Sequence, residues 1–156
     1  MKYWLMKSEP DVYGIDHLEN EKEQTEHWDG VRNYQARNMM RDEMKKGDKV
    51  FFYHSNCDVP GIVGIAKVVT EGYVDHTAFD PKQKYYDAKS DPENPRWYMV
   101  DIQLVRKLKR IISLQELKTY AEIDDMPLVR KGNRLSVMSV EAHQWKFVLG
   151  LEKLKK

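Results

Sequence analysis

The sequence contains a single cysteine, Cys57, among its 156 residues. One thiol cannot form an intrachain disulfide, and there is no cysteine cluster from which a structural zinc site is built. This scarcity is typical of a reducing compartment. We therefore expect a cytoplasmic protein that needs no metal or other cofactor.

Long hydrophobic runs are also missing. Apolar stretches such as residues 50–53 are far too short to cross a bilayer. The first residues lead into strand-like sequence rather than into a signal peptide. We expect a non-secreted protein with no membrane partner.

The net charge is only +1, but it is unevenly distributed. Residues 103–156 carry 12 Lys and Arg against six Asp and Glu, whereas residues 1–102 carry 14 against 19. The basic part is either a surface for a polyanion or an ordinary solvated face.

Catalytic arrays are absent from the sequence as well. The metal-ligand spacing of a zinc deaminase does not occur, and no nucleophile and base pair stands out by its spacing. The five histidines are scattered: His17, His27, His54, His76 and His143. We expect a protein that is not an enzyme; the alternative is a nuclease or base hydrolase that uses Glu9 or His54 as its general base.

What the chain does contain is a folded-protein composition, with 41% hydrophobic residues and four tryptophans. Its length suits one domain around one core, so we expect a single domain over residues 1–156. Strands are predicted at 2–7, 49–53 and 61–70, of which the last two plausibly pair as a hairpin. Helices appear between the strands without a regular βαβ alternation, which predicts an α+β fold around a curved or closed mixed sheet.

The helices and loops are marked by their caps and turn residues. Asn33 is a good N-cap for a helix over 34–46, and Ser139 for a last helix that ends at Gly150. The polar stretch 24–32 is predicted to be a loop. Residues 79–95, rich in Pro and Asp, are predicted to form a long surface loop of the kind that is often functional.

The densest group of polar and aromatic residues runs from Trp28 to Asn38, directly before and into a helix N-terminus. Such an end binds anions or polar ligand atoms. Asn33 and Arg37 share one helix face, as do Tyr34 and Asn38. The alternative is that Asn33 only caps the helix and Tyr34 only packs.

Two further polar groups follow predicted strands: Lys7, Ser8 and Glu9 in one, and the run from Tyr53 to Asn56 in the other. Convergence of these strand ends near Trp28 would create a pocket for a planar heterocycle. Taken alone, a triplet such as Lys7, Ser8 and Glu9 is more often an ordinary turn, and His54 is more often a histidine of the core or the surface.

Five motifs, in this order, resemble the EVE domain family: Tyr3 to Pro10, Trp28 to Asn38, Phe52 to Ser55, Gly64 to Ala66, and Arg134 to Val137. The resemblance covers nearly the whole chain. It implies a PUA-like fold, a strongly bent mixed β-barrel flanked by helices and related to YTH and ASCH domains, with a nucleotide pocket on one face. It also implies recognition of modified bases in DNA or RNA.

With this resemblance, we expect a flipped base, such as methylated or hydroxymethylated cytosine, to enter an aromatic pocket. The expected pocket residues are Lys7, Ser8, Glu9, Trp28, Arg32, Asn33, Tyr34, Tyr53, His54 and Ser55. The expected phosphate contacts are Arg37, Arg130, Lys131 and Arg134.

Two further alternatives stay open beside the enzyme. One is an RNA-binding PUA-like module that does not select for modification, and the other is a protein-interaction or small-ligand module on the same fold. Because Trp28 lies in polar, loop-like sequence, we expect Trp28→Ala to abolish selective binding and leave the domain folded.

Overall fold

The computed structural model describes residues 1–154, and one six-stranded sheet organises them. The order of the strands across the sheet is β2-β5-β4-β3-β1-β6. Their bounds are β1 (Tyr3–Ser8), β2 (Thr25–His27), β3 (Lys49–His54), β4 (Gly61–Val74), β5 (Tyr98–Ser113) and β6 (Val137–Val140).

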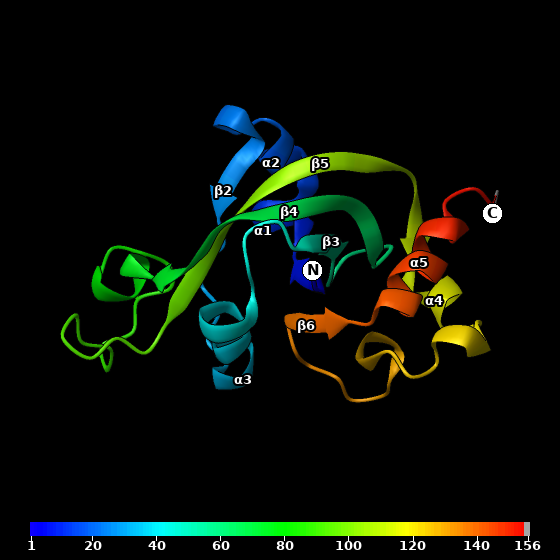
Figure 1. Cartoon of the computed structure of the whole chain (residues 1–156). Coiled ribbons are helices and arrows are strands. Elements are labelled where there is room, and N and C mark those ends of the chain that lie inside the picture. The colour runs from blue at the N-terminus through cyan, green and yellow to red at the C-terminus, as the bar shows by residue number, and fades with distance from the viewer. Residues whose placement is uncertain (155–156) are drawn as a thin grey trace.

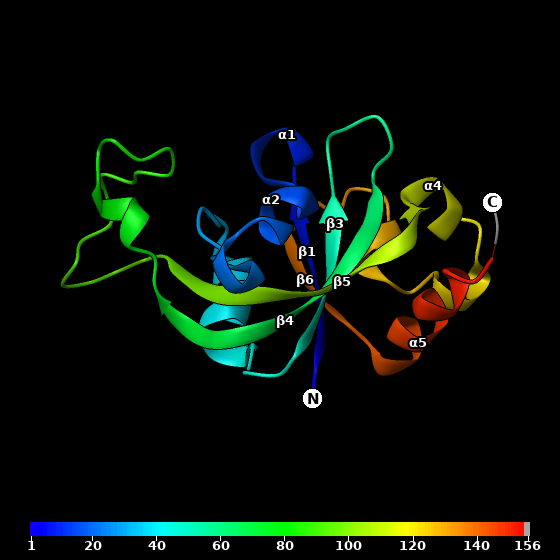
Figure 2. The same cartoon turned by 90° about the horizontal axis from the view of Figure 1, so that it is seen from above.

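The sheet is mixed and strongly bent. Strands β1 and β3 run parallel, and all other neighbours are antiparallel. The two longest strands, β4 and β5, arch across the molecule (Figures 1 and 2). The expected α+β class is thus confirmed, but the edge strands β2 and β6 do not pair with each other in the described part of the chain, so hydrogen bonds do not close the sheet into a barrel.

Short helices surround the sheet. The α-helices are α1 (Pro10–Tyr13), α2 (Ile15–Glu19), α3 (Tyr34–Asn38), α4 (Leu114–Leu117) and α5 (Ala142–Leu151). A π-helical turn, η2 (Met39–Glu43), follows α3, and the 3-10 turns are η1 (Lys22–Gln24), η3 (His76–Phe79), η4 (Ala121–Ile123) and η5 (Pro127–Val129). Helix α3 and the β4–β5 connection lie toward one end of the sheet, and α4 and α5 lie at the other (Figure 1).

Both faces of the sheet are buried at β1 and β3, which explains why these two strands read as continuous apolar runs. Along β1, Trp4 and Met6 join one cluster of core residues while Leu5 joins the other. Strand β3 alternates in the same way, with Phe52 in the first cluster and Phe51 in the second. The first cluster lies under α2, α3 and η2, and the second under α5 and the C-terminal 3-10 turns.

Several local predictions were wrong. The predicted loop 24–32 begins with strand β2, which three polar residues form by backbone pairing with β5, so no apolar period marks it. The helix predicted over 34–46 stays α-helical only to Asn38, although Asn33 caps it as expected. Ser139 lies within β6 opposite Trp4, and the last helix is instead capped by Glu141 and Gln144.

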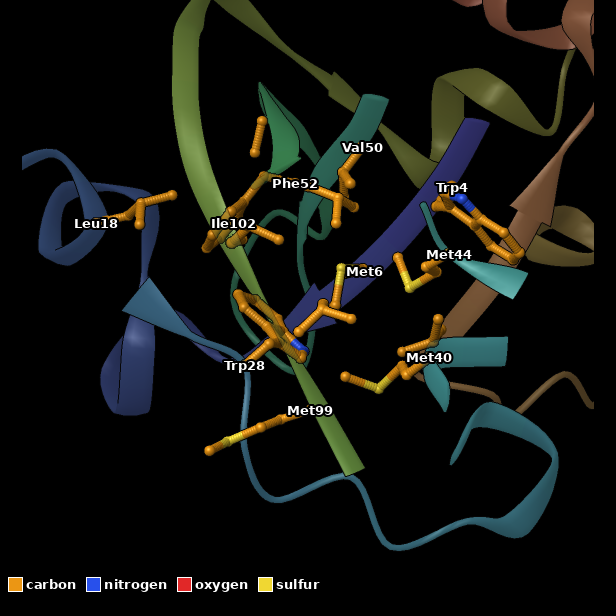
Figure 3. Close-up of a cluster of buried hydrophobic side chains, with 14 of the residues drawn as sticks. Trp4, Met6, Leu18, Trp28, Met40, Met44, Val50, Phe52, Met99 and Ile102 are labelled. Carbon is orange, nitrogen blue, oxygen red and sulfur yellow. The ribbon is translucent and has the colours of Figure 1, made fainter. Parts of the chain in front are cut away.

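Trp28 belongs to the core. Its backbone N–H donates to the Val100 carbonyl at 2.8 Å, which extends the β2–β5 pairing by one residue. Only 8% of the residue is exposed, and its ring meets the edge of Phe52 at 5.4 Å between centroids. Figure 3 shows Trp28 within the first cluster, near Met6 and Met99. The expectation that Trp28 stands outside the core was therefore wrong, because its loop is tethered to a sheet edge.

We accordingly predict that Trp28→Ala destabilises the domain. Truncation of a buried tryptophan leaves a cavity and typically costs about 3–5 kcal/mol. Urea denaturation followed by far-UV circular dichroism measures the loss. Trp28→Phe, which keeps a ring in the same space, is the matched control and should lose clearly less. Parent-like stability of the alanine variant would contradict this placement.

Candidate functional site

One cavity, called the principal cavity here because seven of the expected site residues line it, opens at the carboxyl end of β1 and has a volume of about 600 Å³, which is within the range of small-ligand pockets. Five segments form its walls: the end of β1 with α1, residues 26–32, Ser55 just after β3, residues 84–85, and Arg134 with Ser136. Of the residues expected at a site, the walls contain Lys7, Ser8, Glu9, Trp28, Arg32, Ser55 and Arg134.

Strand pairing brings the floor of the cavity together. The Ser55 N–H donates to the Ser8 carbonyl at 3.0 Å, and the Lys7 N–H donates to the Ser136 carbonyl at 2.8 Å. These bonds prolong the β1–β3 and β1–β6 ladders beyond the regular strands. Three serines, from segments far apart in sequence, therefore stand around one strand end.

Lys7 is the half-buried cation of this floor. Burial lowers the pKa of its ammonium group, and the Nζ atom lies 5.7 Å from the centroid of the Tyr53 ring. Among residues 1–154, no carboxylate lies within ion-pair distance of it. A buried, unneutralised ammonium group favours an anionic ligand.

Lys7 also borders a second hollow of about 810 Å³. Arg130 and Lys131, expected as phosphate contacts, line this second hollow together with Lys118. Arg134 instead lines the principal cavity. The two hollows share Lys7, so Arg130, Lys131 and Arg134 stand on neighbouring parts of one surface.

Carboxylates supply the acceptors of the principal cavity. Glu9, Glu26 and Asp29 all contribute to its walls. Glu9 Oε1 accepts a hydrogen bond from the Asn56 side chain, and Glu26 Oε1 lies 2.9 Å from His27 Nδ1. The cavity thus offers acceptors and cations together.

Arg32 lines the cavity but is largely committed to internal contacts. Its guanidinium group donates to the Tyr85 carbonyl from Nε at 3.2 Å and Nη2 at 2.5 Å, and from Nη1 to Asp75 Oδ2 at 3.0 Å. Burial raises the pKa of Asp75, but hydrogen bonds from Thr77, from the Gly30 N–H and from Arg32 outweigh it and hold that pKa below its ordinary value. Arg32 therefore fixes the loop that carries Tyr85.

Two residues expected at the pocket from α3 lie outside the cavity. Asn33 Oδ1 accepts the Ala36 N–H at 3.0 Å, which is the capping alternative. Tyr34 is 51% exposed and stacks on Trp97 at 4.9 Å between centroids. Arg37 lies beside the same pair of rings: its guanidinium is 4.8 Å from the centroid of the Tyr34 ring, and its Nη1 donates to the Arg96 carbonyl at 2.7 Å.

Two residues of β3 are likewise not part of the cavity wall. Tyr53 is 2% exposed and packs in the second core cluster. His54 Nε2 accepts the Ile15 N–H at 3.1 Å, and burial lowers the pKa of the imidazole. The ring of His54 therefore ties α2 to the end of β3. Of the run from Tyr53 to Ser55, only Ser55, past the strand end, reaches the cavity.

Several cavity residues were missed by sequence reasoning, notably Tyr13, Glu26, Lys84, Tyr85 and Ser136. The long loop 79–95 was predicted to be of a kind that is often functional, and its two adjacent tyrosines were the available signal for a contribution to the cavity. Which of them reaches the cavity depends on the contact with Arg32.

Metal and membrane signatures were sought across residues 1–154. No group of three or more His, Cys, Asp or Glu side chains there is arranged to hold a metal ion. None of the helices in that range combines the length and the apolar character needed to cross a membrane.

Known proteins provide an independent comparison. The model of the EVE domain matches residues 2–151. Thymocyte nuclear protein 1 of Danio rerio is 50% identical, with 96% of this chain and 71% of that protein aligned. A solved protein of Pseudomonas syringae is 49% identical with a TM-score of 0.92, covering 96% of this chain and 99% of the other.

Human THYN1, whose structure was solved in complex with 5-methylcytosine-containing DNA, is 44% identical in sequence to this chain. The two structures superpose with a TM-score of 0.92 over the full length of both chains. The match of the family model and the identity to these relatives extend over nearly all of the fold described above. The chain therefore belongs to the EVE domain family.

Proposed function

We propose that this protein binds nucleic acid and holds one modified base, such as methylated or hydroxymethylated cytosine, in the principal cavity. The observation that carries the proposal is the cavity itself, which combines aromatic walls, paired donors and acceptors, and unneutralised cations at one strand end. The human relative solved with 5-methylcytosine-containing DNA supports the same ligand class.

The polar groups suit the edge of a cytosine. Its exocyclic amino group is a donor that carboxylates accept. Glu9, Glu26 and Asp29 offer such acceptors, while the hydroxyls of Ser8 and Ser55 are donors for the ring nitrogen and carbonyl. A base must leave its stack to reach these groups, at a cost of a few kcal/mol.

The apolar part of the cavity suits a small substituent. Val12 and Val31 contribute to the walls beside Tyr13 and Trp28. A methyl group that leaves water against such a surface gains about 1 kcal/mol. Modification then becomes a difference in affinity rather than an all-or-none signal.

We expect the basic residues to contact phosphates. Arg134 at the cavity and Arg130 and Lys131 at the second hollow form no ion pair with any carboxylate of residues 1–154. Phosphate contacts of this kind add affinity without reading sequence. Arg37 is already bound to the Arg96 carbonyl and lines neither hollow, so we assign it no part in this group.

We propose that the protein acts by binding, without turnover. The two candidate bases are both engaged, Glu9 with Asn56 and His54 with the Ile15 N–H. Mass spectrometry of modified oligonucleotides after incubation with the protein should recover them unchanged. Cleavage or loss of the base would favour the hydrolase alternative.

The proposed ligand class is found in more than one cellular compartment. The animal relatives are named as nuclear proteins, and nucleic acid is present in both nucleus and cytoplasm. The cytoplasmic location expected from the single cysteine stays a prediction.

We predict that a cytosine modification tightens binding by about 3- to 10-fold, the equivalent of one buried methyl group. Fluorescence anisotropy with a panel of otherwise identical oligonucleotides measures this ratio. The panel contains single-stranded and duplex DNA and RNA, each with cytosine, 5-methylcytosine or 5-hydroxymethylcytosine. Equal affinity for modified and unmodified RNA would instead favour an RNA-binding module without selectivity.

We further predict that joint replacement of Arg130, Lys131 and Arg134 by alanine weakens binding of modified and unmodified strands equally. The slope of log Kd against log salt should fall by about 1 for each phosphate that the variant no longer neutralises. Alanine at Lys67, Lys146 and Lys153, exposed lysines that line neither hollow, is the charge-matched control. An unchanged slope would contradict the phosphate role and favour a protein-interaction or small-ligand module.

A further inference from the structure

The connection between β4 and β5 is fastened to the body of the protein at its base. The Asp75 N–H donates to the Trp97 carbonyl at 2.9 Å, which closes the two ends of the loop. Within the loop, Trp97 Nε1 donates to Asp87 Oδ2 at 2.6 Å, and the Asp87 N–H donates to the Ala78 carbonyl at 2.9 Å. The connection is thus an ordered element, although it extends away from the sheet (Figures 1 and 2).

Arg32 draws the middle of this loop to the principal cavity. Its two hydrogen bonds to the Tyr85 carbonyl and the one to Asp75 leave it little freedom to turn toward a ligand. The guanidinium also lies 5.8 Å from the Tyr85 ring centroid and 5.4 Å from that of Trp97. Arg32 is therefore a positioning residue for Tyr85.

Gly30 provides the surface on which the Tyr85 ring rests. A Cβ atom at this position would stand 2.6 Å from three atoms of the ring, closer than any side chain can approach. Gly30 also has a φ of +79°, a conformation that favours glycine, and its N–H donates to Asp75 Oδ2 at 3.0 Å. The contact with the Tyr85 ring and the backbone conformation at this position therefore both require glycine.

The two adjacent tyrosines of the loop differ in their surroundings. Tyr85 is half-buried and lines the cavity, with Lys84 Nζ 5.5 Å from its ring. Tyr86 is 43% exposed and lines none of the hollows described above. One tyrosine therefore belongs to the site, and its neighbour serves as a natural comparison.

We propose that Tyr85 is the aromatic wall against which the inserted base stacks, and that Gly30 and Arg32 are required to place it there. This inference rests on the proposed function. Trp28 and Tyr13 are the other large rings at the cavity, but Trp28 is 8% exposed within the first core cluster, and Tyr13 packs against that cluster with its ring 6.4 Å from the Trp28 ring between centroids. The half-buried Tyr85 ring rests on Gly30, and its backbone carbonyl is held by the Arg32 side chain, so it is better suited to stacking because little of the binding energy is spent on ordering it.

The test compares Tyr85→Ala, Tyr85→Phe and Tyr86→Ala by fluorescence anisotropy on single-stranded DNA with one 5-methylcytosine. Tyr85→Ala should weaken binding by about 5- to 100-fold, the usual effect of losing one stacked base. Tyr85→Phe and Tyr86→Ala should stay within about 2-fold of the parent. Thermal melting verifies that all three remain folded.

An oligonucleotide with an abasic site at the same position separates stacking from a merely structural role. On this ligand the parent and Tyr85→Ala should bind alike, because no base is present to stack. A loss of similar size on both ligands would show that Tyr85 only supports the loop and would overturn the proposal. Parent-like binding of the methylated strand by Tyr85→Ala would overturn it as well.

Gly30→Ala supplies a second variant that leaves the tyrosine in the sequence but displaces its ring. Gly30→Ala should lose as much affinity for the methylated strand as Tyr85→Ala does. The double variant should lose no more affinity than either single variant. Additive losses would overturn the assigned contact. If the parent protein shows no preference for a modified base, the proposed function fails. If the parent is selective but the Tyr85 variants bind as the parent does, only the role assigned to Tyr85 fails.

Discussion

The buried carboxylate of Asp75 is the contact on which the candidate site depends. It accepts hydrogen bonds from the backbone and side chain of Thr77, from the Gly30 N–H and from Arg32. Gly30 and Arg32 belong to the loop before α3, and Thr77 belongs to the β4–β5 connection. These two segments are far apart in the sequence. This carboxylate therefore ties the loop before α3 to the base of the β4–β5 connection, beside the hydrogen bonds from Arg32 to the Tyr85 carbonyl.

The charge of Asp75 is what makes the anchor effective. Burial opposes ionisation, but the four hydrogen bonds reverse this effect and lower the pKa of the carboxyl group. A lowered carboxyl pKa stabilises the folded state above the pKa of the unfolded chain. Acidification removes this stabilisation only as the pH falls through the lowered value, so the anchor is intact at neutral pH.

Core and site share residues in this fold. Trp28 fills the first core cluster and also borders the cavity, and Arg32 lines the cavity while it holds the neighbouring loop. The groups left for a ligand are those at strand ends, where backbone pairing stops and side chains face solvent. Carboxylates and unneutralised cations stand there together, an arrangement that suits a ligand with both a polar heterocycle and phosphates.

Much was determined by the sequence alone. Apolar runs marked β1, β3 and β4, the Asn33 cap marked the start of α3, and the cluster from Trp28 to Asn38 together with the strand-end motifs marked the EVE family and the region of the cavity. These features are local, since propensity and capping act over a few residues. Only tertiary structure decided which of the marked side chains reach the cavity. Tyr53 and His54 lie within a strand buried on both faces, β2 exists through pairing with β5, and Tyr85 is chosen over Tyr86 by hydrogen bonds from a residue more than fifty positions earlier. No pattern of neighbouring residues encodes such long-range contacts, because they arise only when the sheet has brought the segments together.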